Sequence, residues 1–142
     1  MDTLDSIKIG VIAGTPIDTR MGEDFVIQKG HEAVGIPTAS CPEEQNLLQY
    51  MHPDILTEKI MSAVKSFETR GITRTMIYCN SLSSAVDMEY LRAQNPNSVI
   101  VTPLDIYKSL AIRLSSIMLW AANAQCLASI EKIFYDKNPA LE

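Results

Sequence analysis

Short apolar runs recur along the chain and alternate with segments of helical periodicity. The clearest runs occupy residues 7–13, 75–79, 98–101 and 116–122, and a weaker one occupies residues 33–37. Runs of this length, bounded by turn residues, are typical of strands buried on both faces of a parallel sheet. We therefore predict four or five mainly parallel strands.

Four other segments have the spacing of amphipathic helices. The strongest is residues 53–70, which begins with Pro53, precedes Gly71 and places its apolar side chains on one face. That face is formed by Leu56, Ile60, Ala63, Val64 and Phe67. Further helices are predicted at residues 81–94, 103–113 and 123–134. The third of the four has Thr102 as its cap, followed by Pro103 and Asp105.

Alternating strands and helices predict an α/β fold with three layers, α/β/α, around a mainly parallel four- to five-stranded sheet. The chain has 142 residues, of which 46% are hydrophobic, enough for one domain with a substantial core.

Composition and charge narrow the classes of function. The net charge is −5 and the lysines and arginines are scattered, which argues against a nucleic-acid partner. No apolar run is long enough to cross a bilayer, and Met1–Asp5 lacks the features of a signal peptide, so we expect a cytoplasmic protein with no membrane partner. Neither a GxGxxG fingerprint nor a P-loop is present, which disfavours nucleotide binding. The three cysteines lack metal-ligand spacing, so no metal site is predicted.

The main candidate for chemistry is Cys79, which follows the strand predicted at residues 74–78 and precedes Asn80 and Ser81. A thiol in this position lies at the carboxyl edge of the sheet, where α/β folds bind ligands, and near the positive end of the next helix. The competing interpretation is that Cys79 only packs, as free cysteines usually do.

Other polar residues follow the remaining strands and should meet at the same edge. They are Thr15 with Pro16, Thr102, and Asn123. Helix capping alone also explains small polar residues at such places.

These residues carry a family resemblance. The segments 9–16 (IGVIAGTP), 78–81 (YCNS) and 101–105 (VTPLD), in this order and spacing, resemble the aspartate/glutamate racemase superfamily. Residues 121–125 (AANAQ) are similar to the opening loop of that family's second half. The resemblance implies an N-terminal α/β domain over residues 1–111 and a truncated start of the second domain over residues 112–142, packed on the first or on a partner chain.

The resemblance also implies a reaction. In this family, cysteines exchange the α-proton of an amino acid without pyridoxal phosphate, any other cofactor or a metal. By that analogy Cys79 is the catalytic thiol, Asn80 and Ser81 hold the substrate, and Thr15, Pro16 and Thr102 line the site. The implied substrate is a small acidic amino acid, aspartate or glutamate.

The family's second catalytic cysteine has no counterpart in these 142 residues, and Cys126 does not occupy its place. Either the chain is a fragment, or another subunit completes the cleft. We expect a homodimer that forms through the apolar segment 116–134 or through the adjacent edge of the sheet. Two alternatives stay open beside the racemase. One is an isomerase or decarboxylase relative that uses one cysteine, and the other is a catalytically silent module that binds a small ligand or a partner.

Overall fold

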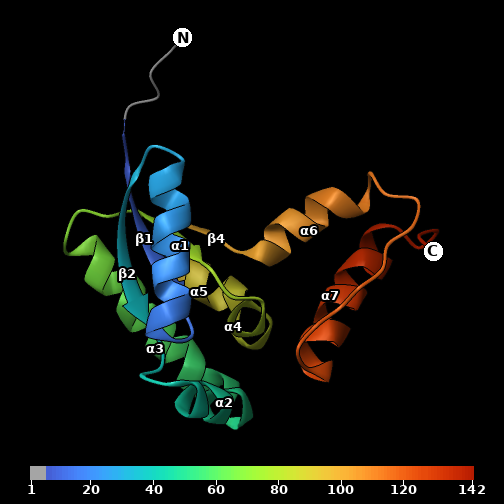
Figure 1. The fold of residues 1–142 in the computed structure, drawn as a ribbon, viewed down its shortest axis with the longest axis horizontal. Helices are drawn as coiled ribbons and strands as arrows, with labels where there is room; N and C mark the ends of the chain where they lie inside the picture. The colour runs from blue at the N-terminus through green and yellow to red at the C-terminus, as the bar shows by residue number, and fades with distance from the viewer. Residues whose placement is uncertain (1–5) are drawn as a thin grey trace.

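A computed structural model describes residues 6–142. Residues 1–5, on which the expectation of no signal peptide depends, lie outside the described residues. The strands are β1 (Lys8–Ala13), β2 (Glu32–Pro37), β3 (Arg74–Ile77) and β4 (Val99–Val101). The helices are α1 (Pro16–Gln28), α2 (Pro42–Tyr50), α3 (Pro53–Glu68), α4 (Asn80–Ala85), α5 (Met88–Gln94), α6 (Pro103–Ala111) and α7 (Ala124–Lys137). Figure 1 shows their arrangement.

The four strands form one parallel sheet in the order β2-β1-β3-β4. At its centre, Gly10 of β1 lies opposite Val34 of β2 on one side and Thr75 of β3 on the other. The predicted α/β class, with a parallel sheet and helices around it, is therefore confirmed.

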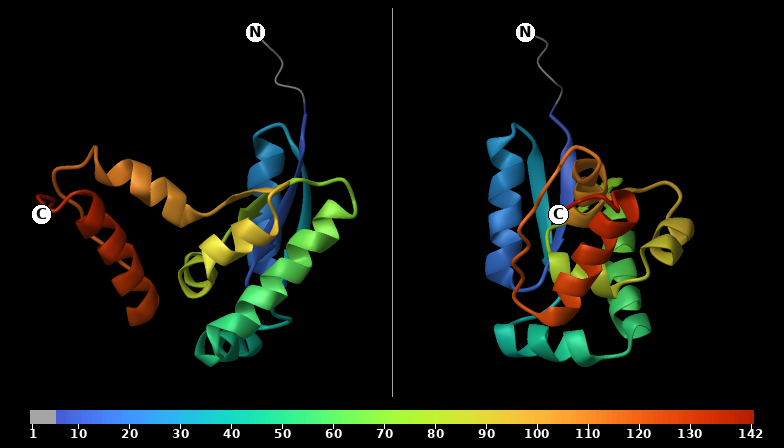
Figure 2. Two further views of the ribbon diagram at one scale, coloured as in Figure 1. Left: turned by 180° about the vertical axis from the view of Figure 1, so that it is seen from behind. Right: turned by 90° about the vertical axis from the view of Figure 1, so that its right-hand side faces the viewer.

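Alternate residues of β1 point to opposite faces of the sheet. Val11 lies against Gly22 of α1, where an added Cβ would come within 2.7 Å of the valine Cγ1. Gly10 faces the other way, and any Cβ there would collide with the ring of Phe67 from α3. Figures 1 and 2 accordingly show α1 on one face and α3 on the opposite face. The main core lies on the α3 side, around fully buried Phe67.

The structure corrects two predictions at the level of elements. Residues 116–122 form no strand, because their chain runs beside α7 and not beside a sheet edge. The helix predicted at residues 81–94 is two helices, α4 and α5, separated at Asp87. Asp87 caps α5 by accepting a hydrogen bond from the N–H of Tyr90 at 2.9 Å, and its own N–H donates to Thr57 at 3.2 Å. Helices α1 and α2 were not predicted.

Helices α6 and α7 extend from the sheet as a C-terminal arm, residues 103–142 (Figure 2). A second hydrophobic cluster holds the arm together, with Ala111 of α6 and Phe134 of α7 buried inside it. Helix α7 also packs against α4, which joins the arm to the loop after β3. In the described part of the chain, no helix is both long enough and apolar enough to cross a membrane.

Candidate functional site

Cys79 lies at the carboxyl end of the central strand β3. The N–H of the preceding Tyr78 donates to the carbonyl of Ile12 at 2.7 Å, which continues the sheet to this point. Cys79 itself is the extended N-cap of α4, and its carbonyl accepts bonds from the N–H and the hydroxyl of Ser83 at 3.1 and 2.7 Å. The thiol is therefore fixed where the strand turns into the helix, as the sequence predicted.

The surroundings of the thiol act on its charge in opposite directions. Burial raises the pKa of Cys79 above its ordinary value of 9.0. The backbone N–H groups of Leu82 and Ser81 lower this pKa, whereas the electrostatic effects of Asp18 and Cys126 raise it further. Because the pKa is raised on balance, the resting thiol is protonated at neutral pH.

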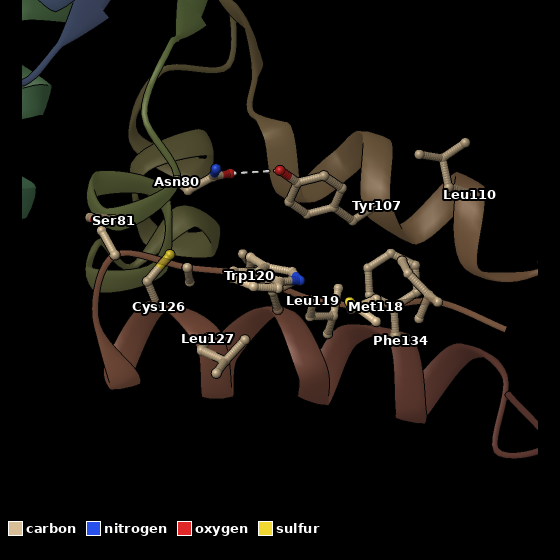
Figure 3. A pocket seen from close by; sticks show the side chains of 14 residues that line it. Asn80, Ser81, Tyr107, Leu110, Met118, Leu119, Trp120, Cys126, Leu127 and Phe134 are labelled. Carbon is tan, nitrogen blue, oxygen red and sulfur yellow. Dashed lines mark hydrogen bonds between the residues drawn. The ribbon is translucent and has the colours of Figure 1, made fainter. Parts of the chain in front are cut away.

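Asn80 and Ser81 connect the loop to the arm. The hydroxyl of Tyr107 on α6 donates to Asn80 Oδ1 at 3.0 Å (Figure 3). Asn123 Nδ2 donates to Ser81 Oγ at 3.4 Å. Three chain segments far apart in sequence therefore meet at the residues that follow Cys79.

A cavity of about 450 Å³ opens between these polar groups and the arm. Asn80, Ser81 and Cys126 form its polar end, and Figure 3 shows aromatic and aliphatic side chains of the arm around the rest. Its apolar lining consists of Tyr107, Leu110, Ile117, Met118, Leu119, Trp120, Ala121, Ala122, Leu127, Ile130 and Phe134. Cys79, which precedes Asn80, is not among the lining residues.

The structure places the other expected site residues in capping motifs. The Thr15 hydroxyl donates to Asp18 Oδ2 at 2.8 Å and accepts from the Asp18 N–H at 3.2 Å. The Thr102 hydroxyl makes the same pair of bonds with Asp105, at 2.9 and 3.3 Å. Pro16 is exposed in the first turn of α1. None of these three residues lines the cavity.

Sequence reasoning did not assign Tyr107 or Cys126 to the site. Tyr107 appeared only as an apolar residue of a predicted helix, and its contact with Asn80 joins positions 27 residues apart. Cys126 is buried in the first turn of α7, where its N–H donates to Asn123 Oδ1 at 2.8 Å. No group of three or more histidine, cysteine or acidic residues suited to a metal ion gathers within the described residues.

No protein-family model matches the chain, and no curated protein matches it.

Proposed function

We propose that the protein is a cofactor-independent enzyme of the racemase type, in which Cys79 removes the α-proton of an amino acid. The resemblance of its motifs to the aspartate/glutamate racemase superfamily implies aspartate or glutamate as substrate. The observation that carries the proposal is the position of Cys79 at the N-terminus of α4, at the carboxyl end of β3. Asn80 and Ser81, the next two residues, lie beside a cavity large enough for an amino acid.

The raised pKa of the thiol is compatible with this role once substrate binds. A bound amino acid brings an ammonium group, and its positive charge lowers the pKa of a neighbouring thiol. The N–H groups of Ser81 and Leu82 then stabilise the thiolate that forms. The thiolate accepts the α-proton to become a thiol, the electron pair stays on the substrate as a carbanion, and return of the proton completes the cycle.

The test is hydrogen exchange in deuterated water. L-aspartate and L-glutamate are incubated with the protein, and deuterium at the α-carbon is measured separately from the D-enantiomer. With one base assigned, we expect exchange to exceed inversion. Cys79→Ser should abolish exchange, and Cys41→Ser, a matched change at the cap of α2, should leave it intact. Exchange that survives in Cys79→Ser would refute the assignment.

Inversion as fast as exchange would require a second proton donor. The Cys126→Ser variant examines one source, because Cys126 lines the cavity and interacts with Cys79 electrostatically. Loss of inversion with retention of exchange would identify Cys126 as that donor. Unchanged inversion would point to a group from another subunit.

A second candidate function is binding without catalysis. The observation that favours it is the burial of Cys79, which raises the thiol pKa and keeps the thiol outside the lining of the cavity. A ligand that binds without any deuterium incorporation would support this silent binding module.

We also propose that the protein forms a homodimer in the cytoplasm. Support comes from apolar side chains that the described chain leaves exposed, notably Trp120 and Met118 on the arm and Val99 on the edge strand β4.

A further inference from the structure

We infer that the cavity beside Asn80 accepts a carboxylic acid with an aromatic or branched apolar body, in preference to a dicarboxylic acid. This inference rests on the proposed function in one respect, because it names the side-chain class of the amino acid on which that function acts. It revises the acidic substrate that the sequence resemblance implies.

The walls of the cavity are mostly apolar. Most of its length is lined by aliphatic and aromatic side chains from α6, α7 and the segment 117–122 that joins them. The rings of Tyr107 and Phe134 stand at a centroid distance of 6.0 Å and a tilt of 33°, which forms one side of the cavity. Such walls stabilise an apolar body by removing its surface from water.

The lining of the cavity also lacks side chains that could pair with a second carboxylate. Among its lining residues there is no lysine, arginine, histidine, aspartate or glutamate. A second carboxylate on the ligand would therefore lose its hydration without gaining an ion pair, which is unfavourable in an apolar site.

The polar end accounts for the one carboxylate that the ligand keeps. Tyr107 donates to Asn80 Oδ1, and this bond fixes the amide so that Nδ2 remains as a donor for a ligand. Ser81 Oγ accepts from Asn123 and keeps its own hydrogen available to donate. Two donors on adjacent residues match the acceptor oxygens of one carboxylate or carbonyl group.

Trp120 makes the binding directly measurable, because it is the one tryptophan of the sequence and lines the cavity. L-phenylalanine and L-glutamate are titrated against the full chain while the fluorescence of Trp120 is followed, with calorimetry as an independent readout. We expect phenylalanine to bind at least about tenfold more tightly, as burial of its ring predicts. Equal affinity, or tighter binding of glutamate, would overturn the inference.

Variants with matched controls test the two ends of the cavity. Leu127→Arg places a cation in the apolar wall and should invert the preference toward glutamate, whereas Leu47→Arg on the exposed side of α2 should not. Asn80→Asp should weaken both ligands about tenfold by repelling their carboxylates, whereas Asn97→Asp in an exposed turn should have no effect. If Leu127→Arg does not fold, Ala122→Arg at the exposed rim replaces it.

The outcomes separate this inference from the proposed function. If phenylalanine binds preferentially but no deuterium enters the α-carbon of phenylalanine, aspartate or glutamate, the result would support the inferred ligand class and count against the proposed catalysis. Exchange of glutamate by a protein that does not prefer phenylalanine would do the reverse. A change in Trp120 fluorescence with protein concentration alone, in the absence of ligand, would show that a second chain fills the cavity and would overturn the inference.

Discussion

At the scale of single residues, the candidate site is a thiol whose charge state depends on a few neighbours. Asp18 in the first turn of α1 is one of them, and its carboxylate raises the pKa of Cys79 in addition to the effect of burial. The same carboxylate accepts hydrogen bonds from the N–H and the hydroxyl of Thr15. A structural cap and an electrostatic influence on the thiol are thus combined in one side chain.

Asp18→Asn is therefore predicted to make the thiolate easier to form. The amide keeps an oxygen for the cap but removes the negative charge, so the pKa of Cys79 falls toward its ordinary value. For the wild type, the exchange rate should rise with pH into the alkaline range, because the raised pKa delays formation of the thiolate. In Asp18→Asn the same rise should begin at lower pH. The measurement is the pH profile of α-deuterium incorporation.

Asp24→Asn supplies the control for this prediction. Asp24 lies on the same helix and carries the same charge, but its carboxylate pairs with Arg20 at 3.2 Å on the exposed side. Equal displacement of both profiles would show that net charge, and not proximity to Cys79, controls the thiol.

The same residues show how far the sequence predicts the site. Placement of Cys79 after β3 follows from a local pattern, an apolar run that stops at small polar residues. The bond from Tyr107 to Asn80 does not follow from any local pattern, because it depends on how α6 leaves the sheet. Tyr107 and Cys126 join the site through tertiary packing alone.

At the scale of elements, two helices begin with the same motif. Thr15-Pro16-Ile17-Asp18 opens α1 and Thr102-Pro103-Leu104-Asp105 opens α6, and both form complete capping boxes. The second motif predicted its helix, whereas the first was interpreted as a loop at the binding edge. The pattern of Thr, Pro and Asp alone was sufficient to find α1, and the weaker amphipathic periodicity of that helix explains why it was missed.

Thr102→Ala is predicted to reduce stability without reducing ligand binding. Loss of the capping hydroxyl should lower the free energy of unfolding by about 1 kcal/mol, measured by urea denaturation. Thr102→Ser keeps the hydroxyl and should recover most of that loss. Thr102 lies outside the cavity lining, so affinity and exchange should be unchanged; a selective loss of affinity would restore its predicted role in the site.

The stability that Thr102→Ala loses should also depend on pH, because the cap includes the Asp105 carboxylate. Burial alone would raise the pKa of Asp105, but bonds from Thr102 and Arg92 outweigh it and hold this pKa below its ordinary value. The stabilisation is therefore present above the ordinary pKa and is lost as the pH falls through the lowered value. The difference between wild type and Thr102→Ala should accordingly shrink in acid.

At the scale of the whole molecule, one face of the sheet is only half covered. Helix α1 packs on β1 and β2, while α6 leads away from the sheet after β4 (Figures 1 and 2). On the α1 side, Val99 and Val101 of β4 are 60% and 40% exposed. They belong to an apolar groove that also contains Phe25 and Met76. Parallel sheets are normally covered on both faces, so this groove is the strongest candidate for the dimer contact.

The predicted state in solution is therefore a dimer that forms through β4 and its groove. Sedimentation at micromolar concentration should give a mass near twice that of the 15.7 kDa chain. Val101→Lys should shift the protein toward the monomer, because a buried, unpaired ammonium group would disfavour the contact. Leu47→Lys, an equally polar change at a 66% exposed residue of α2, should leave the dimer intact.

A wild-type monomer would refute dimerisation. A dimer insensitive to Val101→Lys would instead direct attention to the arm, where Trp120 and Met118 are 87% and 78% exposed.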